Sequence, residues 1–342
     1  MTSETTAGAT ALNILWMWRS DLRFRNKTHY QRPLHVANSQ HSVVLVVRRG
    51  ADIAEEIRQS MEALDRCPIG LTGPLDKLLF LVYAFFAFLK RRKKIDALYT
   101  PPDYSLIWGA VIKRLWPRVY WVADIWDDPR VYRVGGESVA LRCVARLFNW
   151  VVVRALRRAD LVITIGVRTD DHLPHTLISE FGVAPRRILP VTNGIDLEMF
   201  APTTRSQSAG CPGEFRLLYV GSVIKYLGIG DVLESVRDLV PRIPNIRLTL
   251  VGWSTPADEK WLAETISSLE IEEHVDFRGV VHAEQVPAII EASDVCIYPF
   301  PSRGYLDVVF PVKVYEYLAM SKPVVATALP GVLTILRHEE NG

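Results

Sequence analysis

A glycine-containing loop follows an apolar run in the second half of the chain, and it could bind phosphate groups. The run Leu218–Val220 leads into Gly221 and Ser222, and a helical pattern begins near Gly230. Backbone N–H groups in such a loop, together with a helix N-terminus, suit a diphosphate. The glycines could also serve only to permit a tight turn, and Gly228–Gly230 is too short to identify a dinucleotide site.

A carboxylate in a mostly apolar helical pattern is the second candidate. Glu316 lies among Val312, Val314 and other apolar residues. A carboxylate in such surroundings needs partners. The two hydroxyls of a ribose could supply them, or Glu316 could be a surface residue paired with Lys313 three positions earlier.

Two further segments follow expected strands of the first half. Asn193-Gly194 would close the last of these strands, although this dipeptide often marks only a turn. Asp124, Asp127 and Asp128 are expected just beyond the strand 119–123. They could hold a metal, but no histidine flanks them and they could equally begin a turn and cap a helix, so we expect no metal.

Short β-rich runs that alternate with helical patterns would position these groups. Such alternation predicts βαβ units and doubly wound parallel sheets. The strands expected in the first half are 12–18, 42–47, 97–99, 119–123, 161–165 and 188–191, and those in the second half are 216–220, 247–251, 275–278, 295–298 and 323–327. The longer helices expected are 75–93, 105–115, 137–158, 170–181, 229–239, 257–268, 284–292, 312–320 and 332–337.

A stretch without apolar periodicity divides the alternation into two parts. Residues 201–214 are rich in Pro, Gly, Ser and Thr, which is typical of an interdomain linker. We therefore expect an α/β protein with two Rossmann-like domains, 1–200 and 215–342. Open parallel sheets bind ligands at the carboxyl ends of their strands, so the candidate loops should face a cleft between the domains.

The composition excludes several classes of protein. The chain has 342 residues, 23% of them charged and 49% hydrophobic, and its four cysteines are at least 68 residues apart. A disordered chain, a disulfide scaffold and a zinc-finger spacing are excluded. Residues 1–205 carry 29 Lys and Arg against 20 Asp and Glu, whereas residues 206–342 carry 11 against 18. This asymmetry suggests that the first half meets an anionic partner, although compositional drift would also produce it.

One apolar segment ends in a cluster of basic residues. Residues 78–89 are apolar, too few to span a bilayer, which needs about 20. The cluster Lys90–Lys94 follows directly. The segment could lie on an anionic membrane surface, or it could be a buried helix whose basic end complements the helix dipole. The basic residues are too dispersed elsewhere to predict nucleic-acid binding.

Taken together, the motifs from residue 159 onward resemble the retaining, nucleotide-sugar-dependent glycosyltransferases of GT-B fold (glycosyltransferase family 4, group 1). The first 158 residues match only in pattern. The segments that carry the resemblance are Ala159–Ile165, Val191–Asp196, Tyr219–Gly221, Leu250–Gly252, Asp276–Gly279, Ala292–Pro299, Pro311–Lys313, Glu316–Ala326 and Pro330–Gly331.

The resemblance implies transfer of a sugar from a nucleoside diphosphate sugar with retained configuration, no metal and no cofactor. It implies that Glu316 holds the donor ribose, and that Arg278 and Gly279 lie near the nucleobase. The remaining donor-binding residues would be Gly221, Ser222, Asn193, Gly194, Phe310, Pro311, Val312 and Lys313. Lys225 would stabilise the diphosphate, and Asp124 would be catalytic.

The sequence departs from the family pattern at four positions. A second family glutamate would fall near Val308, a basic pair falls on Ser222 and Leu227, and the family histidine is replaced by Ala123. Lys225 is the only cation in the glycine loop. Family members also continue beyond the position of Gly342, so we expect the second domain to be incomplete here.

We therefore predict a cytoplasmic glycosyltransferase, peripheral on the inner face of the membrane, that acts on a lipid-linked or polysaccharide acceptor. A non-catalytic GT-B subunit that binds a partner glycosyltransferase is the alternative. A nucleotide-sugar epimerase would lack any match in the first domain.

Overall fold

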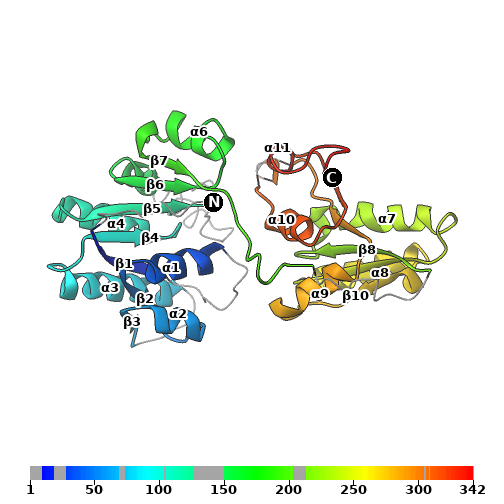
Figure 1. Cartoon of the computed structure of the whole chain (residues 1–342), viewed down its shortest axis with the longest axis horizontal. Helices are drawn as coiled ribbons and strands as arrows, with labels where there is room; N and C mark the ends of the chain where they lie inside the picture. Colours follow the sequence, from blue (N-terminus) through cyan, green and yellow to red (C-terminus); the bar gives the residue numbers. More distant parts are fainter. Residues whose placement is uncertain are drawn as a thin grey trace. The chain divides into compact units, whose positions relative to one another are not determined.

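The computed structural model describes residues 10–18, 28–68, 74–103, 105–126, 150–202, 213–303, 306–307 and 309–341. The chain divides into two compact units, Met1–Thr192 and Asn193–Gly342, and each is described by itself (Figure 1). Most of the expected linker, residues 203–212, lies outside the described residues, as do Asp127, Asp128 and Val308.

The first unit has a parallel sheet in the order β3-β2-β1-β4-β5-β6-β7. Its strands are β1 (Asn13–Trp18), β2 (Ser42–Val47), β3 (Ala63–Arg66), β4 (Ala97–Thr100), β5 (Tyr120–Ile125), β6 (Leu161–Thr164) and β7 (Ile188–Pro190). Its helices are α1 (Thr28–Asn38), α2 (Glu55–Ser60), α3 (Pro74–Arg91), α4 (Ser105–Leu115) and α6 (His172–Ser179), and residues 150–156 are also helical.

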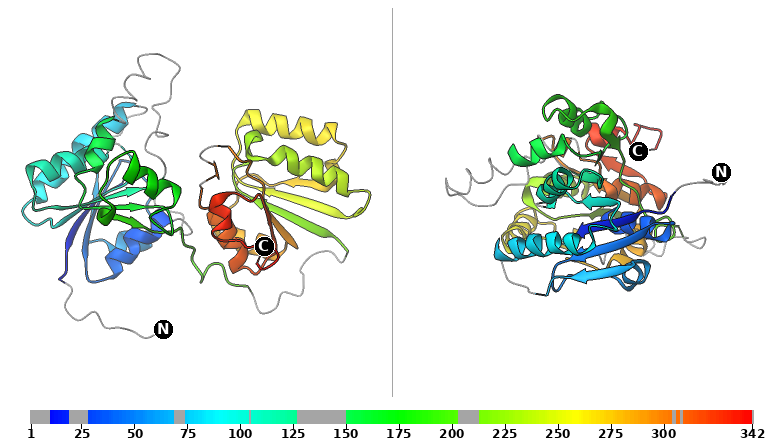
Figure 2. Two further views of the ribbon diagram at one scale, coloured as in Figure 1. Left: turned by 90° about the horizontal axis from the view of Figure 1, so that it is seen from above. Right: turned by 90° about the vertical axis from the view of Figure 1, so that its left-hand side faces the viewer.

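Helices cover both faces of this sheet because side chains alternate along each strand. Leu15 and Met17 of β1 belong to a buried cluster that includes residues of α3, α4, 152–156 and α6. Trp16 and Trp18 belong to the cluster of the other face, which includes residues of α1 and α2. Figure 2 shows α3 and α4 in cyan on the side of the sheet opposite the blue α1 and α2.

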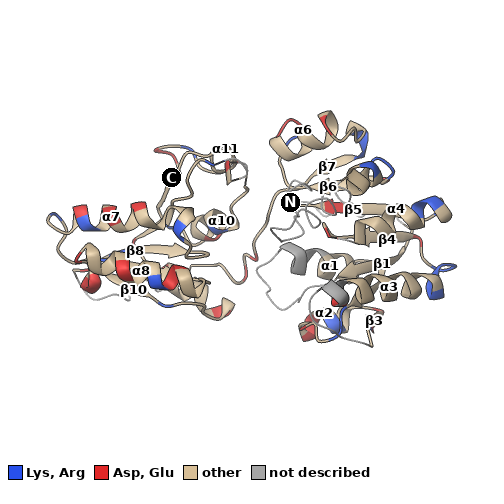
Figure 3. Ribbon diagram, turned by 180° about the vertical axis from the view of Figure 1, so that it is seen from behind, with Lys and Arg blue, Asp and Glu red and all other residues tan. Residues whose placement is uncertain are grey.

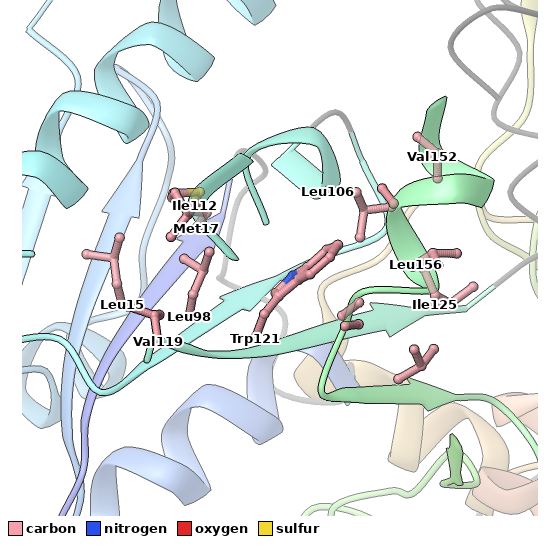
Figure 4. Close-up of a cluster of buried hydrophobic side chains, with 14 of the residues drawn as sticks. Leu15, Met17, Leu98, Leu106, Ile112, Val119, Trp121, Ile125, Val152 and Leu156 are labelled. Carbon is pink, nitrogen blue, oxygen red and sulfur yellow. The ribbon is translucent and has the colours of Figure 1, made fainter. Parts of the chain in front are cut away.

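A tryptophan fills the core between β5 and α4 (Figure 4). Trp121 is fully buried, and its indole N–H donates to the hydroxyl of Thr100 at 2.9 Å. A Cβ atom at Gly109 of α4 would lie 2.0 Å from the indole, so this helix position requires glycine.

The second unit has a parallel sheet in the order β10-β9-β8-β11-β12. Its strands are β8 (Phe215–Val220), β9 (Ile246–Val251), β10 (Val275–Phe277), β11 (Val295–Tyr298) and β12 (Val324–Ala326). Its helices are α7 (Ile229–Leu239), α8 (Pro256–Ser268), α9 (Val286–Glu291), α10 (Val312–Ala319) and α11 (Pro330–Leu333). Helices α7 and α8 pack on one face, and α9, α10 and α11 pack on the other.

Two sheets with parallel strands and helices on both faces confirm the predicted α/β class with two Rossmann-like folds. The division between the units follows Thr192, so the Asn193–Gly194 segment belongs to the second unit rather than to the first domain as expected from the sequence. No helix within the described ranges is long and apolar enough to cross a membrane.

Candidate functional site

The candidate site of the second unit is formed by the loops at the carboxyl ends of β8, β9 and β10. Main-chain hydrogen bonds fasten these loops together: Gly221 N–H donates to Val251 O at 2.9 Å, and Gly252 N–H donates to Gly279 O at 2.8 Å. The N–H of Val223 donates to Trp253 O at 2.8 Å. The loops therefore form one connected edge, which is the edge where open parallel sheets bind ligands.

Glycine is required at two positions because the loops approach each other closely. Gly252 has φ +144°, and a Cβ atom there would lie 1.7 Å from the carbonyl oxygen of Gly221. Gly228, at φ +82°, precedes α7, and a Cβ atom there would lie 2.0 Å from the carbonyl oxygen of Pro299, which follows β11. Both positions combine a backbone conformation that favours glycine with a contact to main-chain atoms.

Two buried tyrosines form hydrogen bonds with the end of β8 and with the loop that begins at Gly221. The hydroxyl of Tyr219 donates to Ser222 O at 2.9 Å, and the hydroxyl of Tyr317 on α10 accepts from Val220 N–H at 2.9 Å. Burial raises the pKa of both phenols. They therefore remain protonated at neutral pH and hold the end of β8 against α10.

Helix α10 carries the predicted ribose-binding carboxylate. Glu316 is fully buried, and its Oε2 atom accepts from Nζ of Lys313 at 2.8 Å. The Lys313 side chain is 20% exposed. The Lys313 contact considered from the sequence is therefore present, but Glu316 is not a helix-surface residue.

The segment before α10 is anchored to the Asn193–Gly194 segment. The amide of Asn193 donates to the carbonyl oxygen of Phe310 at 2.8 Å. Pro311 precedes the first turn of α10, which begins at Val312. Residues predicted from two motifs 117 positions apart are thus brought together beside a helix N-terminus, where the helix dipole favours an anion.

Lys225 and Arg278 have protein partners near the same edge. The ammonium of Lys225 lies 5.6 Å from the ring centre of Trp261 on α8. The main-chain N–H of Lys225 donates to Oδ1 of Asp258 at 3.0 Å. That hydrogen bond, together with the hydroxyl of Thr255, lowers the pKa of Asp258. Arg278 is half exposed and donates to Asp276 at 2.7 Å.

Asp124 lies in the first unit, inside the sheet. The sequence placed it beyond a strand that ended at residue 123, but β5 continues to Ile125. Asp124 is fully buried and accepts a hydrogen bond from the hydroxyl of Tyr99 on β4. Asp124 is paired with Ile163 of β6, so it lies within the sheet rather than in a loop.

The sequence analysis did not single out Trp253. This side chain directly follows Gly252 at the end of β9 and is 54% exposed. An aromatic ring exposed at a ligand-binding edge can stack on a planar group. In the sequence, the only signal for Trp253 as a site residue was its position directly after a glycine at the end of an expected strand. Within the described part of the chain, no three His, Cys, Asp or Glu side chains gather as metal ligands.

The chain is similar to known glycosyltransferases in sequence. It is 26% identical to a D-inositol 3-phosphate glycosyltransferase of Thermobifida fusca, over 80% of this chain and 65% of the relative. It is 28% identical to a protein of the same name from Pseudarthrobacter chlorophenolicus, over 48% of this chain and 40% of the relative. The chain thus spans between 40% and 65% of the length of these relatives.

Solved structures share the fold across both units. The chain resembles Anabaena Alr3699/HepE, solved in complex with UDP, with a TM-score of 0.67 and 18% identity over 96% of this chain and 84% of the other. It resembles sucrose-phosphate synthase from Thermosynechococcus elongatus with a TM-score of 0.69 and 20% identity over 95% and 84%. The family described as glycosyl transferases group 1 matches residues 214–342. The chain therefore has the GT-B fold expected from its motifs, and its residues 214–342 match the group 1 glycosyltransferases.

Proposed function

We propose that the chain transfers a sugar from a nucleoside diphosphate sugar to a lipid-linked or polysaccharide acceptor, with retention of configuration. The observation that carries this proposal is the connected strand-end edge of the second unit beside α10 and its buried Glu316. The solved relative that contains UDP supports a nucleotide donor.

The donor would bind along this edge. Glu316 would accept hydrogen bonds from the two ribose hydroxyls, and Lys313, 2.8 Å from that carboxylate, would turn toward the diphosphate as the ribose arrives. The segment Phe310–Val312 would approach the phosphates at the N-terminus of α10. The base would lie near Gly279 and Arg278, where the exposed ring of Trp253 offers a stacking surface.

Departure of the diphosphate would drive the transfer. Negative charge develops on the leaving oxygen as the bond to the sugar breaks, and fixed dipoles and cations stabilise it. The diphosphate would accept the acceptor's proton on the same face of the sugar, so the configuration is retained without a protein nucleophile or a metal. Lys225 would add positive charge by leaving the face of Trp261. In the first unit Asp124 would be catalytic, and the hydroxyl of Tyr99 that donates to it would mediate its effect.

The first unit would meet an anionic acceptor at the cytoplasmic side of a membrane. Two relatives named D-inositol 3-phosphate glycosyltransferase support an acceptor that carries phosphate. Of the Lys90–Lys94 cluster, Arg91 is paired with Asp65 of β3, while the other four side chains are exposed. These four cations could attract an anionic surface.

Turnover tests the proposal directly. The full chain is incubated with UDP- and GDP-sugars and a polyprenyl-phosphate-linked acceptor, and released diphosphate is measured, with NMR assignment of the product anomer. We expect one donor to be consumed with retention, and Glu316→Gln to abolish turnover. The matched control Glu264→Gln removes an exposed glutamate of α8, and this variant should retain turnover. Absence of turnover with every donor, with nucleotide binding intact, would favour the non-catalytic subunit.

A further inference from the structure

The first unit contains a cavity that the proposed sugar transfer does not use. It has a volume of about 480 Å³ and lies between α4 and the helical residues 150–156. This volume falls in the range of small-molecule sites. Both helices belong to the layer that also contains α3 and that covers one face of the sheet.

Four arginines line the cavity, and none of the described residues that line it is acidic. The four arginines are Arg114, from the last turn of α4, and Arg154, Arg157 and Arg158. Four guanidinium groups around one cavity repel each other unless an anion joins them. Guanidinium groups bind phosphate in bidentate fashion, so the charge complement of this cavity is a phosphate group.

Two of the arginines are held in place before any ligand arrives. The Nε atom of Arg157 donates to the carbonyl oxygen of Phe181 at 2.6 Å, and the guanidinium carbon of Arg154 lies 4.4 Å from the ring centre of Trp150. Fixing these flexible side chains in advance lowers the entropic cost of binding. These two contacts therefore restrain Arg154 and Arg157 before an anion binds.

The rest of the lining is apolar, and a free phosphate would make no favourable contact with it. Ile107, Ala110 and Val111 of α4 share one helix face and are half-buried beside Ala155. Trp150 is 55% exposed. Exposed tryptophans that border apolar surface are typical of proteins that contact the membrane interface. The ligand should therefore carry both a phosphate and a hydrocarbon chain.

The surface of the helical layer that contains α3 and α4 also combines exposed apolar side chains with basic ones. Leu78, Val82 and Phe86 recur every four residues along α3 and are 57%, 42% and 60% exposed. Basic side chains gather at the C-terminal ends of α3 and α4 (Figure 3). An exposed apolar stripe beside cations is the combination that binds an anionic bilayer surface.

From these observations we propose that the cavity between α4 and residues 150–156 binds an anionic phospholipid. Its phosphate lies among the four arginines, and the start of its acyl chain lies along Ile107, Ala110 and Val111. The ends of α4 and of the helix 150–156 precede β5 and β6, so the arginines at these ends lie at the edge of the sheet opposite the carboxyl ends of the strands. The site is therefore separate from the ligand-binding edge of this sheet.

Calorimetric titration of the full chain with dihexanoyl phosphatidylglycerol, kept below its micelle concentration, tests the proposal. We expect saturable binding, no binding of dihexanoyl phosphatidylcholine, and at least tenfold weaker binding of inorganic phosphate. Arg154→Gln/Arg158→Gln should weaken phosphatidylglycerol binding at least tenfold. The control Arg237→Gln/Arg337→Gln removes the same charge from exposed positions of the second unit and should change it less than twofold.

Three results would overturn the site: no binding of the anionic lipid, equal binding of inorganic phosphate, or equal losses in both double variants. The thermal unfolding midpoint of each variant should match the wild type, which separates loss of the site from loss of the fold. Nucleotide binding provides an independent readout, because the arginine variant should retain it. A wild type that binds the lipid but no nucleotide would contradict the proposed sugar transfer and leave the lipid site standing.

Discussion

The ion pair inside α10 should respond very unequally to removal of its two members. Glu316 is fully buried and Lys313 is 20% exposed, with 2.8 Å between Nζ and Oε2. Lys313→Met removes the ammonium beside a buried carboxylate, whereas Glu316→Gln leaves a lysine that still reaches water. Removing one partner of a buried pair costs about 3–5 kcal/mol, because the remaining charge is uncompensated.

The partial exposure of Lys313 sets the expected magnitudes. Because Lys313 is 20% exposed and the pair is not wholly removed from water, we expect Lys313→Met to cost about 3 kcal/mol, the lower end of that range. Glu316→Gln should cost about 1 kcal/mol, the usual value for a lost hydrogen bond. The double variant should be more stable than Lys313→Met alone, because neither charge remains.

Urea unfolding of the full-length variants measures these differences. Hydrogen exchange of peptides that cover residues 312–320 would show whether the loss originates in α10. Equal destabilisation by Lys313→Met and Glu316→Gln, within about 0.5 kcal/mol, would refute the argument that burial of the carboxylate controls the cost. A double variant no more stable than Lys313→Met would refute it as well.

Three other perturbations test the surroundings of the candidate site. Gly252→Ala should destabilise the second unit by several kcal/mol and abolish nucleotide binding, because its Cβ would collide with the carbonyl oxygen of Gly221; unfolding midpoints close to the wild type would contradict this. The hydrogen bond from Arg216 holds the pKa of Asp294 below its usual value, so this pair stabilises the fold above about pH 4 and the contribution is lost as the pH falls further. Asp294→Asn should therefore lower the urea midpoint at pH 7 and lower it progressively less as the pH falls below about 4, and an equal loss at every pH would exclude a charge effect. Burial raises the pKa of Cys296 to about 11, so iodoacetamide at pH 8 should label it only after unfolding, as mass spectrometry of the peptide would show.

Much of the fold could be predicted because the strands are local signals. The runs 42–47 and 295–298 are dense in β-branched residues and form strands with the predicted limits, β2 and β11. The short strand β3, with sequence Ala-Leu-Asp-Arg, lacks that signal and was missed. It forms because the neighbouring β2 offers its edge, which is information that only the folded sheet contains.

Helices, too, could be predicted from the sequence only where the local pattern is clear. The pattern at 229–239 predicts α7 with correct bounds, since four buried apolar residues recur along one face. Helix α1 was missed because it contains Pro33, which argues against a helix in the sequence. The packing of Leu34 against the core of the sheet overrides that local preference.

Candidate residues could be named from the sequence, but only those partners that are close in the sequence could be named with them. The sequence predicted that Glu316 needs partners, and Lys313 was considered as one of them. The hydrogen bond from Asn193 to Phe310 O joins residues 117 positions apart, and no local pattern encodes it. Asp124 was misplaced for a similar reason, because the pairing of β5 with β6, in which Asp124 lies opposite Ile163, extends the strand beyond residue 123.

Nucleotide binding to the second unit is the most direct test of the central claim. The full chain, Glu316→Gln and the control Glu264→Gln are examined by thermal unfolding with UDP, GDP and ADP. A ligand at 100 times its dissociation constant stabilises the folded state by about 2.7 kcal/mol, which raises the midpoint by several degrees. We expect one nucleotide to raise the midpoint of the wild type and the control but not that of Glu316→Gln. No shift with any nucleotide, or an undiminished shift in Glu316→Gln, would contradict the assignment of α10 and the strand-end loops as the donor site.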